Sequence, residues 1–278
     1  MITFLFWNIK KQPLENVVAN LAWQHQVDVL LLAECKISSS EMLQTLNQHE
    51  SLYHYAPDNQ VASKIKVFTR FPAQLIEYVP PNVSERWTIR QLQLSAKDNI
   101  LLAVTHLPDG RNSTKESRNW ECSRLAEAIT AAENWVGHAR TLLMGDFNLN
   151  PFDGGIISAR GLHAVMSHHI AAKESRIVSG ERYPFFYNPM WGRLGDTSPG
   201  PPGTYYYSNA QHEVYFWNTF DQVMLRPALL PAFQPENLQV LQTDGQQSFL
   251  KSTQPIPDEE RLSDHLPILC KLTLDKEF

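Results

Sequence analysis

Residues 142–151 read LLMGDFNLNP, a stretch in which an apolar run ends on two polar side chains. The run at residues 141–144 is typical of a buried strand, and residues two apart in an extended chain point to the same side. Asp146 and Asn148 should therefore share one face at the end of the strand, with Phe147 turned into the packing. Asp and Asn are also common in plain turns, so this stretch alone does not separate a functional site from a strand-to-turn junction.

The whole chain has the size of a single large domain. Its 278 residues suit one α/β or two-sheet domain, and we expect one domain over residues 1–278. It has no run of about 18 apolar residues, which predicts no membrane insertion. The first residues resemble a strand rather than a signal peptide. The three scattered cysteines argue against a disulfide framework or a zinc site and predict a cytoplasmic protein. No feature indicates a protein partner.

The net charge of −5 is unevenly distributed. Residues 60–124 carry ten Lys and Arg against six Asp and Glu, whereas residues 201–278 carry five against ten. A basic stretch in an acidic protein can face a polyanion, although an ordinary solvated surface is an equally good explanation. The basic side chains of interest are Lys64, Lys66, Arg70, Arg86, Arg90, Arg111, Lys115, Arg118 and Arg124.

Hydrophobic periodicity predicts a mixed α/β arrangement. We expect helices at residues 14–24, 38–46 and 115–135, and strands at 2–7, 27–32, 64–69, 74–78, 87–94, 100–105, from 141, 220–225 and 267–273. Strands between residues 60 and 105 follow one another closely, which indicates an antiparallel meander. The pattern predicts mixed sheets packed face to face with helices outside. Residues 183–208, rich in Pro, Gly and aromatics, are predicted to form a long ordered loop.

Polar residues end the apolar strands repeatedly. Six such clusters, drawn mostly from Asn, Asp, Glu and His, suggest strand ends that converge on one rim of a rigid scaffold, where sites are commonly built. The residues are Asn8, Glu34, His106, Asp146 with Asn148, Asp221, and Asp264 with His265.

The ordered motifs WN, LLAECK, THL, GDFNLNP, FDQV and SDHLPI resemble those of the endonuclease/exonuclease/phosphatase superfamily. This superfamily includes DNase I-like nucleases, exonuclease III-like abasic-site endonucleases, sphingomyelinases and inositol-polyphosphate phosphatases. The resemblance runs from residue 7 to about residue 270. It implies a DNase I-like, four-layered α/β sandwich, in which two mixed β-sheets pack face to face and are flanked by helices, with Mg²⁺ or Mn²⁺ at the rim.

Phosphoester hydrolysis requires an in-line water, neutralised phosphoryl oxygens and a stabilised leaving group. Mg²⁺ prefers hard oxygen ligands and keeps several waters, so one or two carboxylates suffice. We predict Glu34 as the main metal ligand, with Asn8 and Asp264 completing the set. A purely structural Glu34 is the alternative.

The resemblance also implies catalytic roles. Asp146 would orient or deprotonate the water, and Asn148 would bind the phosphate or its nucleophile. His265 would polarise the phosphate or act as base, with Asp221 holding its other ring nitrogen. His106 would be a general acid or a second phosphate donor. A hydrogen-bonded strand-end histidine and a turn aspartate are the structural alternatives for His106 and Asp221.

The motifs point to different branches of the superfamily. His106 in THL resembles the DNase I-like and phosphodiesterase branches, whereas Lys36 in AECK resembles the exonuclease III-like branch. The branch motifs therefore leave the substrate open.

The first substrate hypothesis is a DNA nuclease, with no choice between endonuclease and exonuclease. In it Arg90, Arg111 and Lys115 would contact phosphates, and Tyr206 and Trp217 would stack on bases. Against this, a strand of this composition is more often part of a hairpin and its core than a stacking platform.

The alternative is a hydrolase of a small-molecule or lipid phosphoester, such as an inositol-phosphate phosphatase or a sphingomyelinase-like phosphodiesterase, with residues 183–202 as a lid. A non-enzymatic binding module is less favoured, because every charged position of the site is filled.

Overall fold

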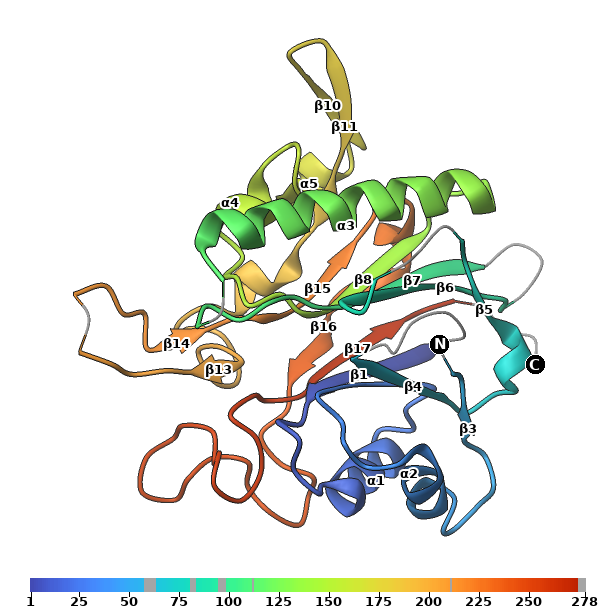
Figure 1. Ribbon diagram of the computed structural model, residues 1–278, viewed down its shortest axis with the longest axis vertical. Coiled ribbons are helices and arrows are strands. Elements are labelled where there is room, and N and C mark those ends of the chain that lie inside the picture. The colour runs from blue at the N-terminus through green and yellow to red at the C-terminus, as the bar shows by residue number, and fades with distance from the viewer. Residues whose placement is uncertain (58–63, 81–83, 95–98, 112, 211, 275–278) are drawn as a thin grey trace.

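Two large β-sheets form the centre of the protein, as the computed structural model shows for residues 1–57, 64–80, 84–94, 99–111, 113–210 and 212–274 (Figure 1). The six-stranded sheet contains, in spatial order, β16 (Phe233–Val240), β17 (Ile268–Leu272), β1 (Ile2–Asn8), β2 (Val29–Ala33), β4 (Ile65–Thr69) and β3 (His54–Tyr55). The seven-stranded sheet contains β5 (Ile76–Tyr78), β6 (Trp87–Leu92), β7 (Ile100–His106), β8 (Thr141–Asp146), β15 (Asp221–Leu225), β12 (Phe186–Tyr187) and β9 (Ala164–Val165).

Helices and two small ribbons surround these sheets. The α-helices are α1 (Glu15–Gln24), α2 (Ser39–Leu46), α3 (Lys115–Val136), α4 (Gly154–Ile157) and α5 (His168–Ala171), and the 3₁₀ helices are η1 (Ala73–Leu75), η2 (Pro189–Arg193) and η3 (Pro227–Ala232). The ribbons are β10 (Ser175–Val178) with β11 (Glu181–Pro184), and β13 (Tyr205–Tyr206) with β14 (Trp217–Asn218).

The alternation of side chains along β1 explains the layering. Phe4 and Phe6 enter the core between the two sheets, whereas Leu5 and Trp7 pack on the opposite face, in the cluster that includes α1 and α2. This is the two-residue period of an extended chain with both faces covered.

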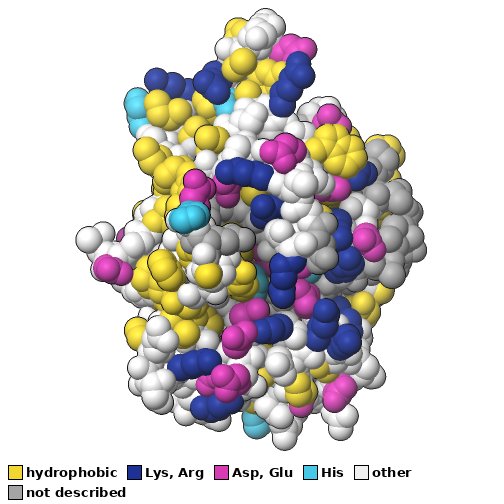
Figure 2. Space-filling view, turned by 60° about the vertical axis from the view of Figure 1, so that its left-hand side comes forward, with side chains coloured by type: hydrophobic (Ala, Val, Ile, Leu, Met, Phe, Trp, Pro, Cys, Tyr) yellow, Lys and Arg dark blue, Asp and Glu magenta, His cyan; other side chains and the backbone are white. Residues whose placement is uncertain are grey.

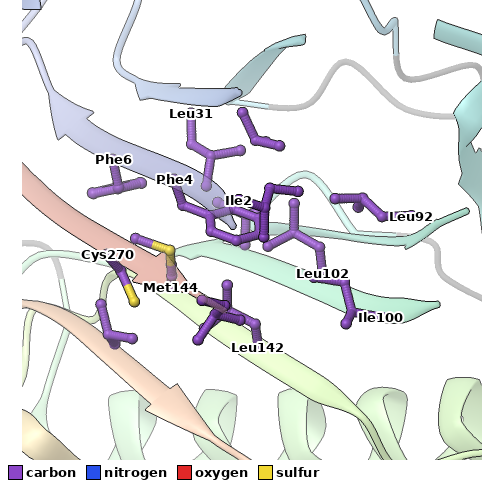
Figure 3. Packing of buried hydrophobic residues seen from close by; sticks show 14 of the residues in the cluster. Ile2, Phe4, Phe6, Leu31, Leu92, Ile100, Leu102, Leu142, Met144 and Cys270 are labelled. Atoms are coloured by element: carbon purple, nitrogen blue, oxygen red, sulfur yellow. The ribbon is translucent and has the colours of Figure 1, made fainter. Parts of the chain in front are cut away.

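The middle layer draws on both sheets, as Figure 3 shows. Ile2, Phe4 and Leu31 come from one sheet and Leu102 and Leu142 from the other, and all five are fully buried. Burial of such side chains contributes roughly 1.5–3 kcal/mol each, so the hydrophobic packing of this layer holds the two sheets together.

Helix α3 covers the outer face of the seven-stranded sheet (Figure 1). Thr114 caps its first turn by accepting a hydrogen bond from Ser117 N, and Gly137 ends it with φ 76°. This left-handed conformation is readily adopted by glycine. With α1 and α2 on the other side, the predicted four-layered α/β sandwich is confirmed.

The predicted helices match the observed ones to within two residues, but two predictions of topology are wrong. Strand β4 belongs to the six-stranded sheet, where Val67 pairs with Leu31 of β2, so only β5, β6 and β7 form the meander. Residues 183–208 are not one loop, because they contain the end of β11 and all of β12, η2 and β13. The cause is that local periodicity carries no information on which sheet a strand joins.

Several further elements were not predicted from the sequence, among them β10, β11 and β16. The β10–β11 ribbon projects from the body (Figure 1), and β16 is an irregular strand whose register with β17 shifts between Phe233 and Leu238. Pro and charged residues interrupt the apolar pattern of β16, as is usual for an edge strand.

In the described part of the chain, no helix combines the length and the apolar character that crossing a bilayer requires.

A buried ion pair fastens α3 to the seven-stranded sheet. Glu133 Oε1 lies 2.8 Å from Arg226 Nε and accepts a 2.6 Å hydrogen bond from Thr141 Oγ1. The Arg226 guanidinium also donates to the carbonyl oxygens of Pro184 and Phe185. Removal of one partner would leave the other charge buried without compensation.

We therefore expect Arg226→Met to lower the free energy of unfolding by about 3–5 kcal/mol, the usual cost of breaking a buried pair from one side. The double variant Glu133→Leu/Arg226→Met should recover much of that loss. Urea denaturation measures both, and an equal loss in the single and double variants would contradict the uncompensated-charge explanation.

Candidate active site

Strand direction brings the predicted residues to one rim. In each sheet the central pair of strands is parallel, β1 with β2 and β7 with β8. Parallel strands finish at the same edge, so Asn8 lies at the end of β1 beside Glu34 after β2, and His106 pairs in register with Asp146.

The two antiparallel neighbours start where those strands end. Asp221 opens β15 directly opposite Asp146, and His265 shortly precedes β17, the partner of β1. His265 is held there by a bridge to Tyr205 and by the 2.9 Å hydrogen bond from Trp7 Nε1 to its carbonyl oxygen. The predicted convergence of strand ends on one rim is therefore observed.

Gly145 allows the closest approach of β7 and β8. A Cβ at this position, where φ is 152°, would lie 2.1 Å from the carbonyl oxygen of Thr105. The glycine in GDFN is therefore required sterically, one residue before the pair formed by His106 and Asp146.

Asp146 is the most connected side chain of the rim and is 1% exposed. Its Oδ2 accepts a 3.0 Å hydrogen bond from Asn8 Nδ2, and its Oδ1 accepts one of 2.9 Å from Asn148 N. The Nε2 atoms of His106 and His265 both lie 3.8 Å from Oδ2. One carboxylate oxygen thus lies near two imidazole nitrogens without a direct hydrogen bond to either, so a water or a phosphoryl oxygen beside them could contact all three groups.

His265 and Asp221 form a buried ion pair. His265 Nδ1 lies 2.8 Å from Asp221 Oδ2. Burial alone would lower the pKa of His265, but the carboxylates of Asp221 and Asp146 outweigh it and raise that pKa to about 10. Complete burial raises the pKa of Asp221 to about 6, against the attraction of His265. At neutral pH the pair is imidazolium and carboxylate, so His265 is a donor rather than a base.

His106 has the opposite electrostatic character. Burial lowers its pKa more than the nearby carboxylates of Asp146 and Glu34 raise it. Its Nε2 lies 3.5 Å from Glu34 Oε1, and its buried Nδ1 has no hydrogen-bond partner among the described residues. A neutral imidazole that directs Nε2 towards the rim fits a phosphate donor.

Several rim residues have a left-handed backbone. Lys10, Lys11, Glu34 and Asn148 have φ between 49° and 62°. Residues with a Cβ adopt this region at an energetic cost, and such conformations cluster at functional sites.

The rim forms the floor of a cavity of about 730 Å³. Asn8, Glu34, Asp146, Asp264 and His265 all line it. Figure 2 shows Lys, Arg, Asp and Glu side chains gathered in the hollowed middle of the presented face.

The predicted metal ligands fit a hard divalent cation. Asn8, Glu34 and Asp264 present an amide and two carboxylates to the same cavity. Both carboxylates already form ion pairs with lysines. Lys11 Nζ lies 3.4 Å from Glu34 Oε2, and Lys10 Nζ lies 3.2 Å from Asp264 Oδ2.

A second grouping of possible ligands is less suitable. Asp146, Asp221 and His265 also lie close enough together to hold a cation. In this grouping, however, His265 Nδ1 and Asp221 Oδ2 already pair with each other at 2.8 Å, and Asp146 Oδ2 accepts a hydrogen bond from Asn8.

The predicted substrate-binding residues separate into two groups. Arg111 lines the cavity, whereas Lys115 lies 2.8 Å from Asp153 and is not in the lining. Arg90 is 2% exposed and donates to Thr88 and the Pro57 carbonyl, so the structure does not bring it to the site. Its place on β6, in the packed sheet, is the reason.

The aromatic prediction was one residue out of phase. Tyr206 and Trp217 pack on each other with ring centroids 5.6 Å apart, and neither lines the cavity. Tyr205 of β13 and Tyr207 just after it do line the cavity, since residues two apart in extended chain point to the same side. Tyr215 of the same hairpin lines it as well.

Sequence reasoning also missed three basic residues. Lys10 and Lys11 follow the Trp7-Asn8 motif directly, and this adjacency was a usable signal. Arg118 was noted only as part of the basic stretch, yet it lines the cavity and donates to the carbonyl oxygen of Asn148. That contact joins the start of α3 to the GDFN segment.

Solved structures share this fold over the whole chain. An endonuclease/exonuclease/phosphatase family protein from Leptotrichia buccalis matches with TM-score 0.57 and 14% identity, covering 100% of both chains. An AP endonuclease from Archaeoglobus fulgidus matches with TM-score 0.57 and 12% identity, covering 99% of this chain and 100% of its own. D. rerio TDP2, complexed with a single-strand DNA product, matches with TM-score 0.55 and 17% identity, covering 98% and 99%.

No protein-family model matches the sequence, and a search of curated proteins finds no match either. Because the structural identities are low, the likeness shows the fold: the chain has the DNase I-like fold of the endonuclease/exonuclease/phosphatase superfamily.

Gly145→Ala tests how the strands set the rim. The added methyl group should force β7 and β8 apart, with a stability loss of about 1–3 kcal/mol typical of overpacking. Displacement of the rim by about 1 Å should reduce any hydrolytic activity about 10²-fold. Gly192→Ala is the matched control, because its Cβ meets nothing within 4 Å. Thermal unfolding measures the stability of both variants, and steady-state kinetics measures their hydrolytic activity. A fully active, stable Gly145→Ala protein would contradict the steric requirement.

Proposed function

On this DNase I-like fold, we propose that the protein is a phosphodiesterase that depends on Mg²⁺ or Mn²⁺ and hydrolyses DNA with a water activated in line. The observation that carries the proposal is the environment of Asp146, whose Oδ2 lies 3.8 Å from the Nε2 atoms of both His106 and His265. Asp146 and His265 line the cavity of about 730 Å³, and His106 lines an adjoining cavity of about 400 Å³. This arrangement supplies a site for a nucleophile and two donors for the phosphoryl group.

The roles follow from protonation. Asp146, hydrogen-bonded by Asn8 and Asn148, orients the attacking water and accepts its proton. The His265 imidazolium, held by Asp221, donates to a phosphoryl oxygen as negative charge develops there. Neutral His106 donates a second hydrogen bond from Nε2, which favours the donor role over the general-acid role.

Asn148 completes the floor beside the nucleophile. Its Nδ2 donates to the carbonyl oxygen of Leu107, which fixes the side-chain amide at the cavity wall. This position suits the predicted contact with the phosphate or the water. Asn8, Glu34 and Asp264 would hold the cation, which neutralises phosphoryl charge when bound.

Three observations favour DNA over a small ester. Arg111, Arg118 and the Lys10–Lys11 pair place cations around the cavity, and Tyr205, Tyr207 and Tyr215 add aromatic surface on which bases can stack. D. rerio TDP2 is described with single-strand DNA, and the Neisseria 3′ phosphatase NExo, a further match with TM-score 0.54 and 15% identity over 98% of this chain and 99% of its own, with a DNA hairpin. Residues 183–202, which the small-ester hypothesis predicts as a lid, do not line the cavity.

Asp146→Asn should reduce hydrolysis by about 10²- to 10⁴-fold, because it removes the proton acceptor. Asp244→Asn is the matched control: Asp244 is also buried, with 4% exposure, but lies outside the cavity. Plasmid and oligonucleotide cleavage with Mg²⁺ or Mn²⁺ measures the effect, and circular dichroism checks the fold. Activity near wild type in a folded Asp146→Asn protein would refute the proposed role.

His265→Ala should reduce hydrolysis by about 10²- to 10³-fold, the cost of losing one preorganised donor. His163→Ala serves as control, because His163 is 2% exposed and lies away from the cavity. Equal losses in the two histidine variants would point to a general effect on folding.

The Asp221–His265 pair predicts a bell-shaped pH profile. The pKa of about 6 for Asp221 means that activity rises as pH passes about 6 and the carboxylate ionises. The pKa of about 10 for His265 means that activity falls as pH approaches 10 and the imidazolium is lost. These two values belong to the pair as a unit. Asp221→Asn should lower the alkaline limit, because the charge that raises the pKa of His265 is gone, and kcat against pH measures it.

Chelation should abolish hydrolysis, with recovery on addition of Mg²⁺ or Mn²⁺. Glu34→Gln, which removes one ligand charge, should raise the cation concentration needed for half-maximal rate. Undiminished turnover in excess EDTA would exclude the predicted ligand set.

A further inference from the structure

A second cavity, of about 400 Å³, adjoins the first. The two share Lys11, Glu34 and Asp109 as a common wall. The rest of its lining is Cys35, Lys36, Lys64, Lys66, Arg86, His106 and Pro108.

The second cavity lies where the two sheets meet. Lys64 and Lys66 belong to the β4 region of one sheet, and Arg86 leads into β6 of the other. Backbone hydrogen bonds join these segments, from Lys64 N to the carbonyl oxygen of Glu85 and from His106 N to that of Arg86. The cationic side chains are therefore held in a fixed relation to His106 and the catalytic floor.

The charge of this cavity is strongly positive. Its lining includes five Lys and Arg side chains, three of them Lys64, Lys66 and Arg86, against the carboxylates of Glu34 and Asp109. Lys64 and Arg86 both approach Glu85, at 3.3 and 3.7 Å, but that carboxylate is 54% exposed and outside the lining. Exposed pairs of this kind are weak, so an anion in the cavity can replace them.

Further features limit what the cavity can hold. Its volume suits a single phosphate with part of its nucleotide, and is small beside a duplex. Lys66 Nζ already donates to the carbonyl oxygen of Ile37, which fixes one cation at the wall. Phosphate contacts from Lys and Arg position a strand without reading its sequence.

We propose that the second cavity binds a non-scissile phosphate of the substrate strand, next to the phosphodiester that is hydrolysed. The proposal rests on the proposed function and names its substrate more closely: a polynucleotide strand that carries at least two phosphates and passes over the wall formed by Lys11, Glu34 and Asp109. An ester with one phosphate requires only the floor formed by Asp146, His106 and His265, and not the Lys and Arg side chains of the second cavity.

The test compares substrates with one and with several phosphates. Lys64→Gln/Arg86→Gln neutralises two cations of the cavity that do not line the catalytic one. For an oligonucleotide, KM should rise about tenfold with kcat nearly unchanged, and the salt dependence of binding should flatten by about one phosphate contact. Hydrolysis of bis-p-nitrophenyl phosphate, which has one phosphate, should be unchanged.

The matched control is Arg124→Gln/Lys251→Gln, which removes the same charge from outside both cavities. An equal loss in this control, an unchanged oligonucleotide KM, or an equal loss on both substrates in the test variant would overturn the proposal. Oligonucleotides with and without a 5′-phosphate identify the ligand: an effect confined to the phosphorylated one means a terminal phosphate, and an equal effect means an internal one.

Failure of the proposed function would be visible separately. In that case the wild-type protein hydrolyses neither substrate. Fluorescence anisotropy with a labelled oligonucleotide and the otherwise intact protein still measures binding, and unchanged affinity in Lys64→Gln/Arg86→Gln would overturn the second phosphate site by itself.

Discussion

The hydrogen bond from Asn8 to Asp146 joins the two sheets at the point where the site is built. Asn8 ends a strand of the six-stranded sheet, Asp146 ends one of the seven-stranded sheet, and their side chains meet at 3.0 Å with 2% and 1% exposure. A buried polar group without a partner costs about 1–3 kcal/mol, so each residue requires the other. The apolar layer fixes the spacing of the sheets, and this contact fixes their alignment at the rim. The positions of the predicted metal-ligand oxygens relative to the histidines follow from that alignment.

The two histidines differ in protonation because different surroundings lie at the Nδ1 atom of each ring. His265 has the Asp221 carboxylate at Nδ1, which keeps the ring charged, whereas the Nδ1 of His106 is buried without a partner among the described residues, and burial keeps that ring neutral. A site with one charged and one neutral donor can stabilise growing phosphoryl charge without presenting two buried cations to each other. Asp146 lies within 3.8 Å of both rings and is 1% exposed, and such low exposure strengthens its electrostatic interactions with them.

The rim could be predicted from the sequence, and its surroundings could not. Polar residues at strand ends depend only on local pattern and on the rule that parallel strands finish at one edge, so Asn8, His106 and Asp146 were found together. The sheet that β4 joins depends on long-range pairing, which periodicity does not encode. The sequence also did not show which aromatic side chains of the β13–β14 hairpin face the cavity. In a short hairpin a shift of one residue exchanges the two faces, and the local sequence around Tyr206 and Trp217 does not fix this alternation. Arg90 is buried within the sheet, and the sequence alone does not show whether a charged residue in a strand faces solvent or the packed interior.

The division between strands and loops also explains how one fold can act on different phosphoesters. The catalytic floor is set by strand register and by the close approach at Gly145, and it tolerates little change. The cavity walls come from the segment with Arg111, the hairpin with Tyr207 and Tyr215, and the β4 region with Lys64 and Lys66. These walls can change charge and shape without moving a floor residue. Reaction class is therefore a property of the sheets, and substrate class is a property of the loops around them. In this chain the walls place cations on both sides of Glu34, and this arrangement of charge matches the proposed substrate, a strand with successive phosphates.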